Sequence, residues 1–184
     1  MKKPLLFAQQ LISEKLRAGG VAVDATCGNG HDTLFLAEQV GSKGTVLAFD
    51  IQPQAIFATQ QRLTDAGLLN RVRLYQVSHT DLDKYPTAGI DAMMFNLGYL
   101  PGGDHSVVTQ AESTVTALRV AVEKLNKGGI ITLVIYTGHA GGQEEYEAVR
   151  RFAVELPQAR YSVLEYQLIN QVNHPPLLLA IVKR

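Results

Sequence analysis

The chain has 184 residues, of which 46% are hydrophobic and 18% are charged. This composition excludes an extended disordered chain, and the length suits one domain spanning residues 1–184. The 17 basic and 17 acidic side chains balance, so no global field attracts nucleic acid, although a local patch can still bind a polyanion. A single cysteine excludes an internal disulfide framework and fits a reducing compartment. No run approaches the about 20 apolar residues of a membrane span, and the N-terminus lacks the apolar region of a signal peptide, so we expect a cytoplasmic protein without membrane partners.

The first half of the chain alternates between helical and extended patterns. Leu5, Ala8 and Ile12 have the spacing of one helix face, and Pro53 suits the first turn of a later helix. The expected order is helix 4–18, strand 20–25, helix 31–40, strand 45–50, helix 53–66 and strand 71–77.

The second half continues this alternation and then changes. We expect Gly128 and Gly129 to end a long helix, and residues 130–136 to form a central parallel strand because they are apolar throughout. The last two strands are joined without a helix, so they should pair antiparallel. The expected order is strand 90–95, helix 107–125, strand 130–136, helix 142–155, strand 160–168 and strand 177–182. The sequence therefore predicts an α/β fold with a seven-stranded, mostly parallel sheet and a C-terminal antiparallel hairpin.

The segment from Val21 to Thr33 has the pattern of a buried strand, a glycine turn and the start of a helix. Asp24 ends the strand, and Gly28 and Gly30 let the backbone pass close to a ligand. The next strand ends in Asp50, whose carboxylate can accept from both hydroxyls of a ribose. Together these features predict a cofactor that contains adenosine.

Two classes of cofactor use this layout. Dinucleotide enzymes need a third glycine, because a pyrophosphate lies on the helix N-terminus. That position is Thr33 here, and Asp32 places a negative charge where the pyrophosphate would be. S-adenosylmethionine fits better, since its ammonium and its cationic sulfur suit Asp24 and Asp32. We therefore predict S-adenosylmethionine and not NAD. The alternative is an ordinary strand–turn–helix with helix-capping acids, which leaves Asp50 unexplained.

A second cluster follows the strand at 90–95, in the stretch Asn96-Leu-Gly-Tyr-Leu-Pro-Gly-Gly-Asp104. Asn96 offers a carbonyl that could hold an amine nucleophile in line with a methyl group, and Tyr99 offers a face for a stacked base. A turn-rich loop built from Asn, Gly and Pro is the alternative. Ligands bind at the carboxyl ends of strands in such sheets. The polar residues at expected strand ends are Asp24, Asp50, His79, Asn96 and His139.

The whole chain resembles one small family of class I methyltransferases, the MnmM-type enzymes, formerly described as putative rRNA methylases. The resemblance rests on the motifs above, on the block from Tyr136 to Gly142 and on the block from Asn170 to Pro176. Characterised members convert the 5-aminomethyl group of a tRNA wobble uridine, usually 2-thiolated, to methylaminomethyl. The resemblance implies a Rossmann-like fold, S-adenosylmethionine as cofactor and the tRNA anticodon arm as partner. Strand-end loops would hold that arm, with or without a second copy of the chain in a homodimer.

The resemblance also implies roles for individual residues. It implies substrate-side roles for Asn96, Tyr99, Tyr136 and His139, where His139 could accept an amine proton. It implies cofactor contacts at Asn29, Asp32, Asp50, Gln52 and His79. With the glycine motif, the expected cofactor-binding set is Asp24, Gly28, Asn29, Gly30, Asp32, Thr33, Asp50, Gln52 and His79.

Other readings of the sequence remain open. We interpret Cys27 as a packing residue, because it lies in the glycine turn expected to contact the cofactor and not in the stretch from Asn96 to Asp104 expected to contact the substrate. The histidines show no metal-ligand spacing, so no metal site is expected. A different RNA or DNA amino-methyltransferase, acting on rRNA or on adenine, is an alternative function, since Asn-Leu-Gly-Tyr is similar to the Asn-Pro-Pro-Tyr of such enzymes. A non-catalytic S-adenosylmethionine-binding module is another.

Overall fold

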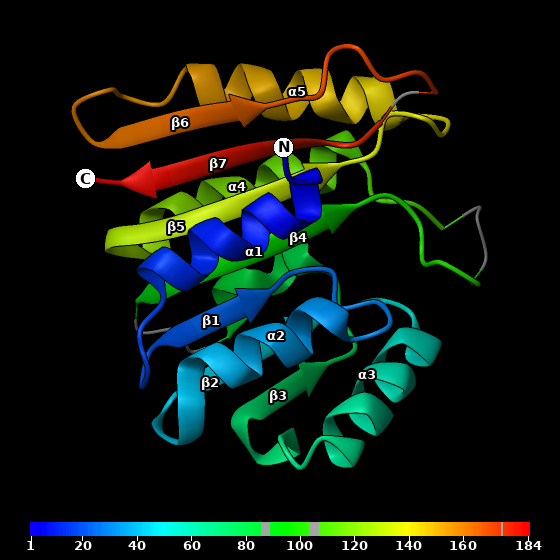
Figure 1. The fold of residues 1–184 in the computed structure, drawn as a ribbon, viewed down its shortest axis with the longest axis vertical. Helices are drawn as coiled ribbons and strands as arrows, with labels where there is room; N and C mark the ends of the chain where they lie inside the picture. The colour runs from blue at the N-terminus through cyan, green and yellow to red at the C-terminus, as the bar shows by residue number, and fades with distance from the viewer. Residues whose placement is uncertain (86–88, 104–106, 174) are drawn as a thin grey trace.

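A seven-stranded sheet forms the centre of the structure (Figure 1). The computed structural model describes residues 1–85, 89–103, 107–173 and 175–184, so Asp104 and His174 of the two sequence motifs lie outside the described residues. The strands are β1 Val21–Asp24, β2 Thr45–Phe49, β3 Val72–Tyr75, β4 Ile90–Leu97, β5 Leu125–Ile135, β6 Tyr161–Tyr166 and β7 Leu177–Lys183. Their order is β3-β2-β1-β4-β5-β7-β6, with β7 antiparallel to both β5 and β6 and the other pairs parallel. The expected mostly parallel sheet with a closing hairpin is confirmed.

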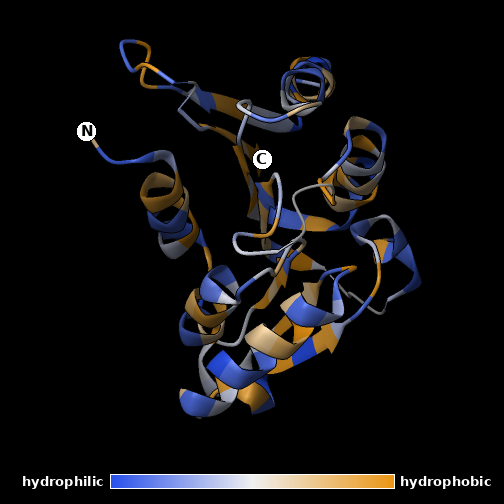
Figure 2. Cartoon of the chain, turned by 90° about the vertical axis from the view of Figure 1, so that its right-hand side faces the viewer, coloured by the Kyte–Doolittle hydropathy of each residue, from blue (hydrophilic) through white to orange (hydrophobic). Residues whose placement is uncertain are grey.

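Helices cover both faces of the sheet. They are α1 Pro4–Lys15, α2 His31–Val40, α3 Pro53–Asp65, α4 Ala111–Lys124 and α5 Gly142–Val154, with short 3-10 turns η1 Gly41–Lys43, η2 Leu69–Arg71 and η3 His79–Lys84. Successive strand residues point to opposite faces, so Met94 packs with α1, α2 and α3 while Met93 packs with α4 and α5. Figure 2 shows the apolar residues gathered in the sheet between these two helical layers. Within the described ranges, no helix has the length and apolar character needed to cross a membrane.

The start of β5 differs from the expectation. We expected Gly128 and Gly129 to end the preceding helix, but α4 ends at Lys124 and β5 begins at Leu125. Leu125 pairs with Ile90 and Ile130 pairs with Ala92, so the extra residues form a bulge. Gly128 has a φ of 82°, and a Cβ on Gly129 would lie 3.0 Å from the carbonyl oxygen of Asp91. The glycines therefore serve a crowded bulge rather than a helix end.

The start of α4 also differs. The helix was expected from about residue 107, but it begins at Ala111, and Val108 instead forms an antiparallel bridge with Tyr99. This bridge places Val108, shortly before α4, beside Tyr99, shortly after β4.

The carboxyl ends of the parallel strands meet at one edge of the sheet, at the right of Figure 1. Because β7 is antiparallel, Leu177 at its start pairs with Ile135 at the end of β5. The connection between β6 and β7 therefore reaches the same edge as the loops after β4 and β5.

Candidate functional site

A cavity of about 630 Å³ opens at this edge of the sheet. Its wall combines the glycine loop after β1, the turns after β2 and β3, the end of β4, the loop after β5 and the segment before α4. Ten of the residues expected from the sequence line it together: Gly28, Asn29, Asp32, Asp50, Gln52, His79, Asn96, Tyr99, Tyr136 and His139.

Asp24, Gly30 and Thr33 do not lie in the cavity wall but behind it. The side chain of Asp24 is only 1% exposed, and its Oδ2 accepts from the Thr33 hydroxyl at 2.6 Å. Gly30 has a φ of 78°, and a Cβ there would lie 2.8 Å from the Cα of Thr59 on α3. The missing side chain at Gly30 therefore lets α3, rather than a ligand, approach closely. Asp24, Gly30 and Thr33 all support the glycine loop from the side that faces the protein interior.

Two contacts from α3 also hold the glycine loop. Thr59 donates its hydroxyl to the carbonyl of Gly28 at 3.0 Å, and Arg62 donates Nε to the carbonyl of Asn29 at 2.7 Å. Sequence reasoning missed both, because polar residues on an amphipathic helix give no signal of where they point.

Asp50 lies directly after β2 and joins the two turns at the sheet edge. Its Oδ2 accepts from the amide of Gly28 at 3.0 Å, and its Oδ1 accepts from the amide of Gln52 at 2.9 Å. Burial raises the pKa of this carboxyl, while the backbone donors oppose that rise. Asp50 lines the cavity, and its carboxylate has more lone pairs than these amides use, so it can still accept from a ligand hydroxyl.

Asp24 and Asp32 form an acidic pair beside the glycine loop. Burial raises the pKa of Asp24 to about 7, and the nearby charge of Asp32 adds to the rise. Burial also raises the pKa of Asp32, which accepts from Nε2 of Gln9 on α1 at 3.0 Å. Two poorly solvated carboxyls that repel each other favour a bound cation, which would stabilise their charged forms.

Asn96 lies near the end of β4 with its side chain held in one orientation. Its backbone amide donates to the hydroxyl of Thr26 at 2.8 Å, and its Nδ2 donates to Oδ2 of Asp32 at 3.4 Å. A carboxylate oxygen accepts, so the amide nitrogen faces Asp32 and the carbonyl faces away from it. This Oδ1 is buried and has no hydrogen-bond partner among the described residues. The cavity therefore contains a prepared acceptor for an N–H or O–H group.

His139 lies in the loop after β5 with one ring nitrogen committed. Its Nδ1 lies 2.9 Å from the carbonyl oxygen of Ala140, which can only accept, so Nδ1 carries the proton. Its Nε2 is buried and lacks a hydrogen-bond partner in the described part of the chain. In the neutral ring this nitrogen has a free lone pair, so it can accept a proton.

Two tyrosines complete this side of the cavity. Tyr99 is 42% exposed, and its ring lies 6.2 Å from that of His139 at an interplanar angle of 82°. Burial raises the pKa of Tyr136, and the charges of Asp32 and Tyr99 add to the rise, so its hydroxyl stays protonated at neutral pH. These rings offer faces for stacking and a hydroxyl for hydrogen bonding.

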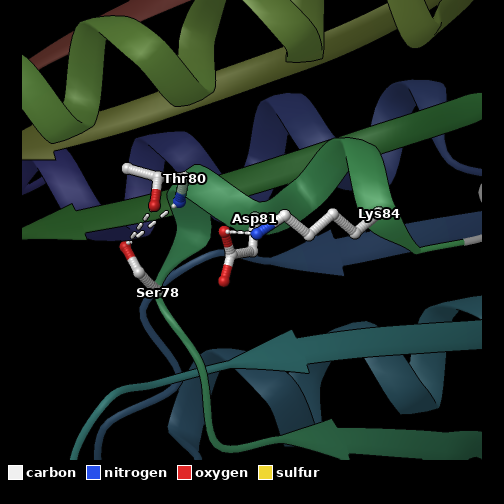
Figure 3. A network of polar contacts seen from close by, with 4 residues as sticks. All are labelled: Ser78, Thr80, Asp81 and Lys84. Atoms are coloured by element: carbon white, nitrogen blue, oxygen red, sulfur yellow. Dashed lines mark hydrogen bonds and ion pairs between the residues drawn. The ribbon is translucent and has the colours of Figure 1, made fainter.

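His79 begins the η3 turn that follows β3. The Ser78 side chain accepts from the amide and the hydroxyl of Thr80, and Lys84 pairs with Asp81 at 2.7 Å (Figure 3). These contacts fix the turn that carries His79. Burial lowers the pKa of His79, and its buried Nε2 has no hydrogen-bond partner within the described ranges. A neutral imidazole thus lies in the part of the cavity wall that follows β3.

Cys27 lines the same cavity but is not a nucleophile. Burial raises the pKa of its thiol, and the neighbouring Asp24 adds to the rise, so the thiolate does not form at neutral pH. Among the described residues, no cluster of three or more His, Cys, Asp and Glu side chains could hold a metal ion.

Glu145 is a buried residue that the sequence analysis missed. It lies in the first turn of α5 and is fully buried, and its carboxylate accepts from the hydroxyls of Thr109 at 2.7 Å and Thr114 at 2.6 Å. The Thr109 hydroxyl accepts from the amide of Gly98 at 2.9 Å, and the Glu145 amide donates to the carbonyl of Gly141. Glu145 therefore ties the loop that carries Tyr99 to the loop that carries His139.

The chain is similar to known proteins over nearly its whole length. The family described as "Putative rRNA methylase" matches residues 46–182. A chloroplastic tRNA (mnm(5)s(2)U34)-methyltransferase from Arabidopsis thaliana is 37% identical over 187 aligned residues, which cover 96% of this chain and 68% of that protein.

Two crystal structures match the fold closely. One is described as a putative rRNA-methylase from Clostridium thermocellum, with 47% identity, a TM-score of 0.98 and coverage of 100% of this chain and 99% of that chain. The other is a putative methyltransferase from Streptococcus mutans in complex with SAH, with 38% identity, a TM-score of 0.92 and the same coverage of both chains.

Proposed function

This chain belongs to the family described as "Putative rRNA methylase", and from that membership we propose that residues 1–184 form one S-adenosylmethionine-dependent methyltransferase domain. Its substrate is the amine of 5-aminomethyl-(2-thio)uridine at the tRNA wobble position, and its product is 5-methylaminomethyl-(2-thio)uridine. The Arabidopsis relative supports this substrate, because its name gives the same modified nucleoside at position 34.

The donor set of the cavity fits a cationic adenosyl cofactor. The Asp50 carboxylate can accept from a ribose hydroxyl, and Gln52 and His79 line the same cavity. The acidic pair Asp24 and Asp32 suits a positive charge, with Asp32 in the wall and Asp24 behind it. When bound, S-adenosylmethionine supplies an electrophilic methyl group on a positively charged sulfur.

One observation carries the choice of an amine substrate: Oδ1 of Asn96 is buried and has no hydrogen-bond partner in the part of the chain that the structure describes. A buried acceptor without a partner costs about 1–3 kcal/mol, so a ligand that donates to it is favoured. An alkylamine is mostly protonated at neutral pH and must lose a proton before it can attack. Asn96 accepts one N–H and so orients the nitrogen, while Nε2 of His139 accepts the proton that leaves. Tyr99 stacks on the uracil ring.

We also propose the partners and the compartment of the reaction. The loops after β4 and β5 hold the anticodon arm beside the cavity, with Tyr99 exposed at 42% for contact with RNA. A homodimer would extend this surface by the matching loops of a second copy. The cytoplasm is the proposed compartment, because the one cysteine is a free, buried thiol.

The test compares two tRNAs that differ only at the wobble uridine. One carries the 5-aminomethyl group and the other is unmodified, and each is incubated with radiolabelled S-adenosylmethionine before nucleoside analysis. We expect label in methylaminomethyluridine from the first tRNA and none from the second, because unmodified uridine has no comparable nucleophile. Equal labelling of both tRNAs, or label on adenine, would move the protein to a different amino-methyltransferase activity.

A further inference from the structure

A second, smaller cavity of about 360 Å³ lies next to the first. Three segments line it: the loop after β5, the start of α5 and the connection between β6 and β7. Its polar lining residues are Thr137, Gln143, Tyr146, Gln167, Gln171 and Asn173. The block from Asn170 to Pro176, to which the proposed methyl transfer gives no role, thus contributes to this wall.

The two cavities share one piece of backbone. Thr137 lines the second cavity, while its chain neighbours Tyr136 and Gly138 line the first. The pairing of Ile135 with Leu177 holds the β6–β7 connection against this loop. An RNA strand that places one base in the first cavity is therefore within reach of the second.

The chemistry of the second cavity suits a nucleobase. Four amide side chains line it, each with donors and an acceptor, and no charged side chain lines it among the described residues. A phosphate can only accept hydrogen bonds, so it would leave the amide oxygens without donors, and an apolar guest would leave the amides without any partner. Unpaired bases are recognised by hydrogen bonds to their edges and by stacking on aromatic rings.

Two contacts prepare this wall for a guest. The Tyr146 hydroxyl donates to Glu165 at 3.0 Å, which fixes the ring, and Nε2 of Gln143 donates to Glu147 at 3.0 Å, which leaves its carbonyl oxygen to accept. Asn173 has a φ of 63°, a left-handed conformation that Asn tolerates better than most residues, so the connection is bent sharply here. Ile169 is 88% exposed beside the cavity and offers an apolar contact to a base.

We propose that the second cavity binds an unpaired base of the same RNA strand, adjacent to the nucleotide that receives the methyl group. This inference rests on the proposed function, because it takes RNA as the substrate. Binding two neighbouring bases in separate cavities would splay the anticodon loop and fix the position of the target uridine.

The test is a thermodynamic cycle between protein and RNA. The protein variants are Gln143→Ala/Gln171→Ala and, as a matched control, Gln60→Ala on α3; all three glutamines are exposed, so folding should not change. The RNAs are an anticodon stem-loop and two copies in which the base on either side of the wobble position is removed. Fluorescence anisotropy gives the dissociation constant of each pair, and methyl transfer is measured separately.

We expect removal of one of the two flanking bases to weaken binding about tenfold in the wild type and in Gln60→Ala, the scale of one stacked base. The double variant should bind the intact stem-loop about tenfold more weakly and should lose little more when that base is absent. The proposal is overturned if, at both flanking positions, removal of the base weakens binding by the double variant as much as it weakens binding by the wild type. It is also overturned if the double variant binds the intact stem-loop with wild-type affinity. Because binding is read without catalysis, a protein that binds in this way but transfers no methyl group would refute the proposed function alone.

Discussion

Nδ2 of Asn96 donates to the carboxylate of Asp32 across 3.4 Å, which joins the end of β4 to the first turn of α2. Asn96 is proposed to hold the substrate amine, and Asp32 is proposed to face the cofactor. The hydrogen bond joins these two side chains. The proposed substrate side and the proposed cofactor side of the cavity are therefore linked by a direct side-chain hydrogen bond.

Replacing Asn96 by alanine should lower the single-turnover rate of methyl transfer at least about tenfold and change cofactor affinity little, because the lost acceptor acts on the nucleophile. Rapid-quench assays on aminomethylated tRNA give the rate, and calorimetry gives the affinity. Asn70→Ala, at an exposed position in η2, is the control. A near-normal single-turnover rate would remove Asn96 from the mechanism.

Replacing Asp50 by alanine should weaken S-adenosylmethionine binding by roughly 1–3 kcal/mol, the scale of hydrogen bonds to a charged group. The variant also leaves the backbone amides of Gly28 and Gln52 without their acceptor, which lowers the stability of the protein with or without the cofactor. Isothermal calorimetry measures the effect, with Asp65→Ala, at an exposed position on α3, as control. Tighter binding of NAD than of S-adenosylmethionine by the wild type would reject the cofactor assignment.

The stability of the ligand-free protein should depend on pH through Asp24. Its pKa is about 7 in the folded protein against an ordinary value of 3.8, so the folded state keeps this proton while the unfolded chain releases it. The free energy of unfolding should therefore fall as pH rises from about 4 to about 7. Asp24→Asn stays neutral and should lose this contribution. Urea titrations at several pH values measure it, and parallel pH profiles of wild type and variant would contradict it.

Cofactor binding should follow the opposite trend over the same range. A cationic ligand favours ionised Asp24 and Asp32, so the affinity of the wild type for S-adenosylmethionine should rise between pH 5 and pH 8. Calorimetry in buffers of different ionisation enthalpy should show proton release on binding, and Asp24→Asn should reduce it. Binding without any proton release would show that the acidic pair does not sense the ligand.

Replacing Glu145 by glutamine should raise the KM for tRNA or lower kcat by about three- to tenfold, the equivalent of about one hydrogen bond, while cofactor affinity stays unchanged. Glutamine keeps the size of the side chain but has only one oxygen to accept from Thr109 and Thr114. Steady-state kinetics and calorimetry separate the two effects. Glu144→Gln is the control, since Glu144 is the exposed neighbour. An equal loss of cofactor affinity would indicate general unfolding rather than loop positioning.

Much of the sheet edge could be predicted because its signals are local. Apolar runs mark the strands, and a polar residue that follows such a run must lie near the carboxyl end of the strand, which places Asp50 and Asn96 in the cavity wall. The role of Gly30 could not be predicted, because the local sequence does not show whether a ligand or a helix lies over a glycine. The structure places Thr59 there.

Glu145 shows most clearly what could not be predicted from the sequence. An acid in the first turn of a helix has the sequence pattern of an exposed residue that stabilises the helix N-terminus. Its burial depends on Thr109 and Thr114, which lie far earlier in the chain. The bulge in β5 has the same origin: Gly128 and Gly129 match a helix end locally, and only the neighbouring β4 determines that they lie within a strand.

The division of the sheet has a consequence for how this enzyme could diverge. The residues proposed to contact the cofactor come from the chain up to His79, whereas the loops proposed to contact RNA come after β4 and after β5 and from the β6–β7 hairpin. Insertions or exchanges in the hairpin tip would alter which RNA is accepted without disturbing the packing of β1, β2 and β3. A lineage with this fold can therefore acquire a new acceptor through changes in one short surface loop, while it inherits the methyl-donor site intact.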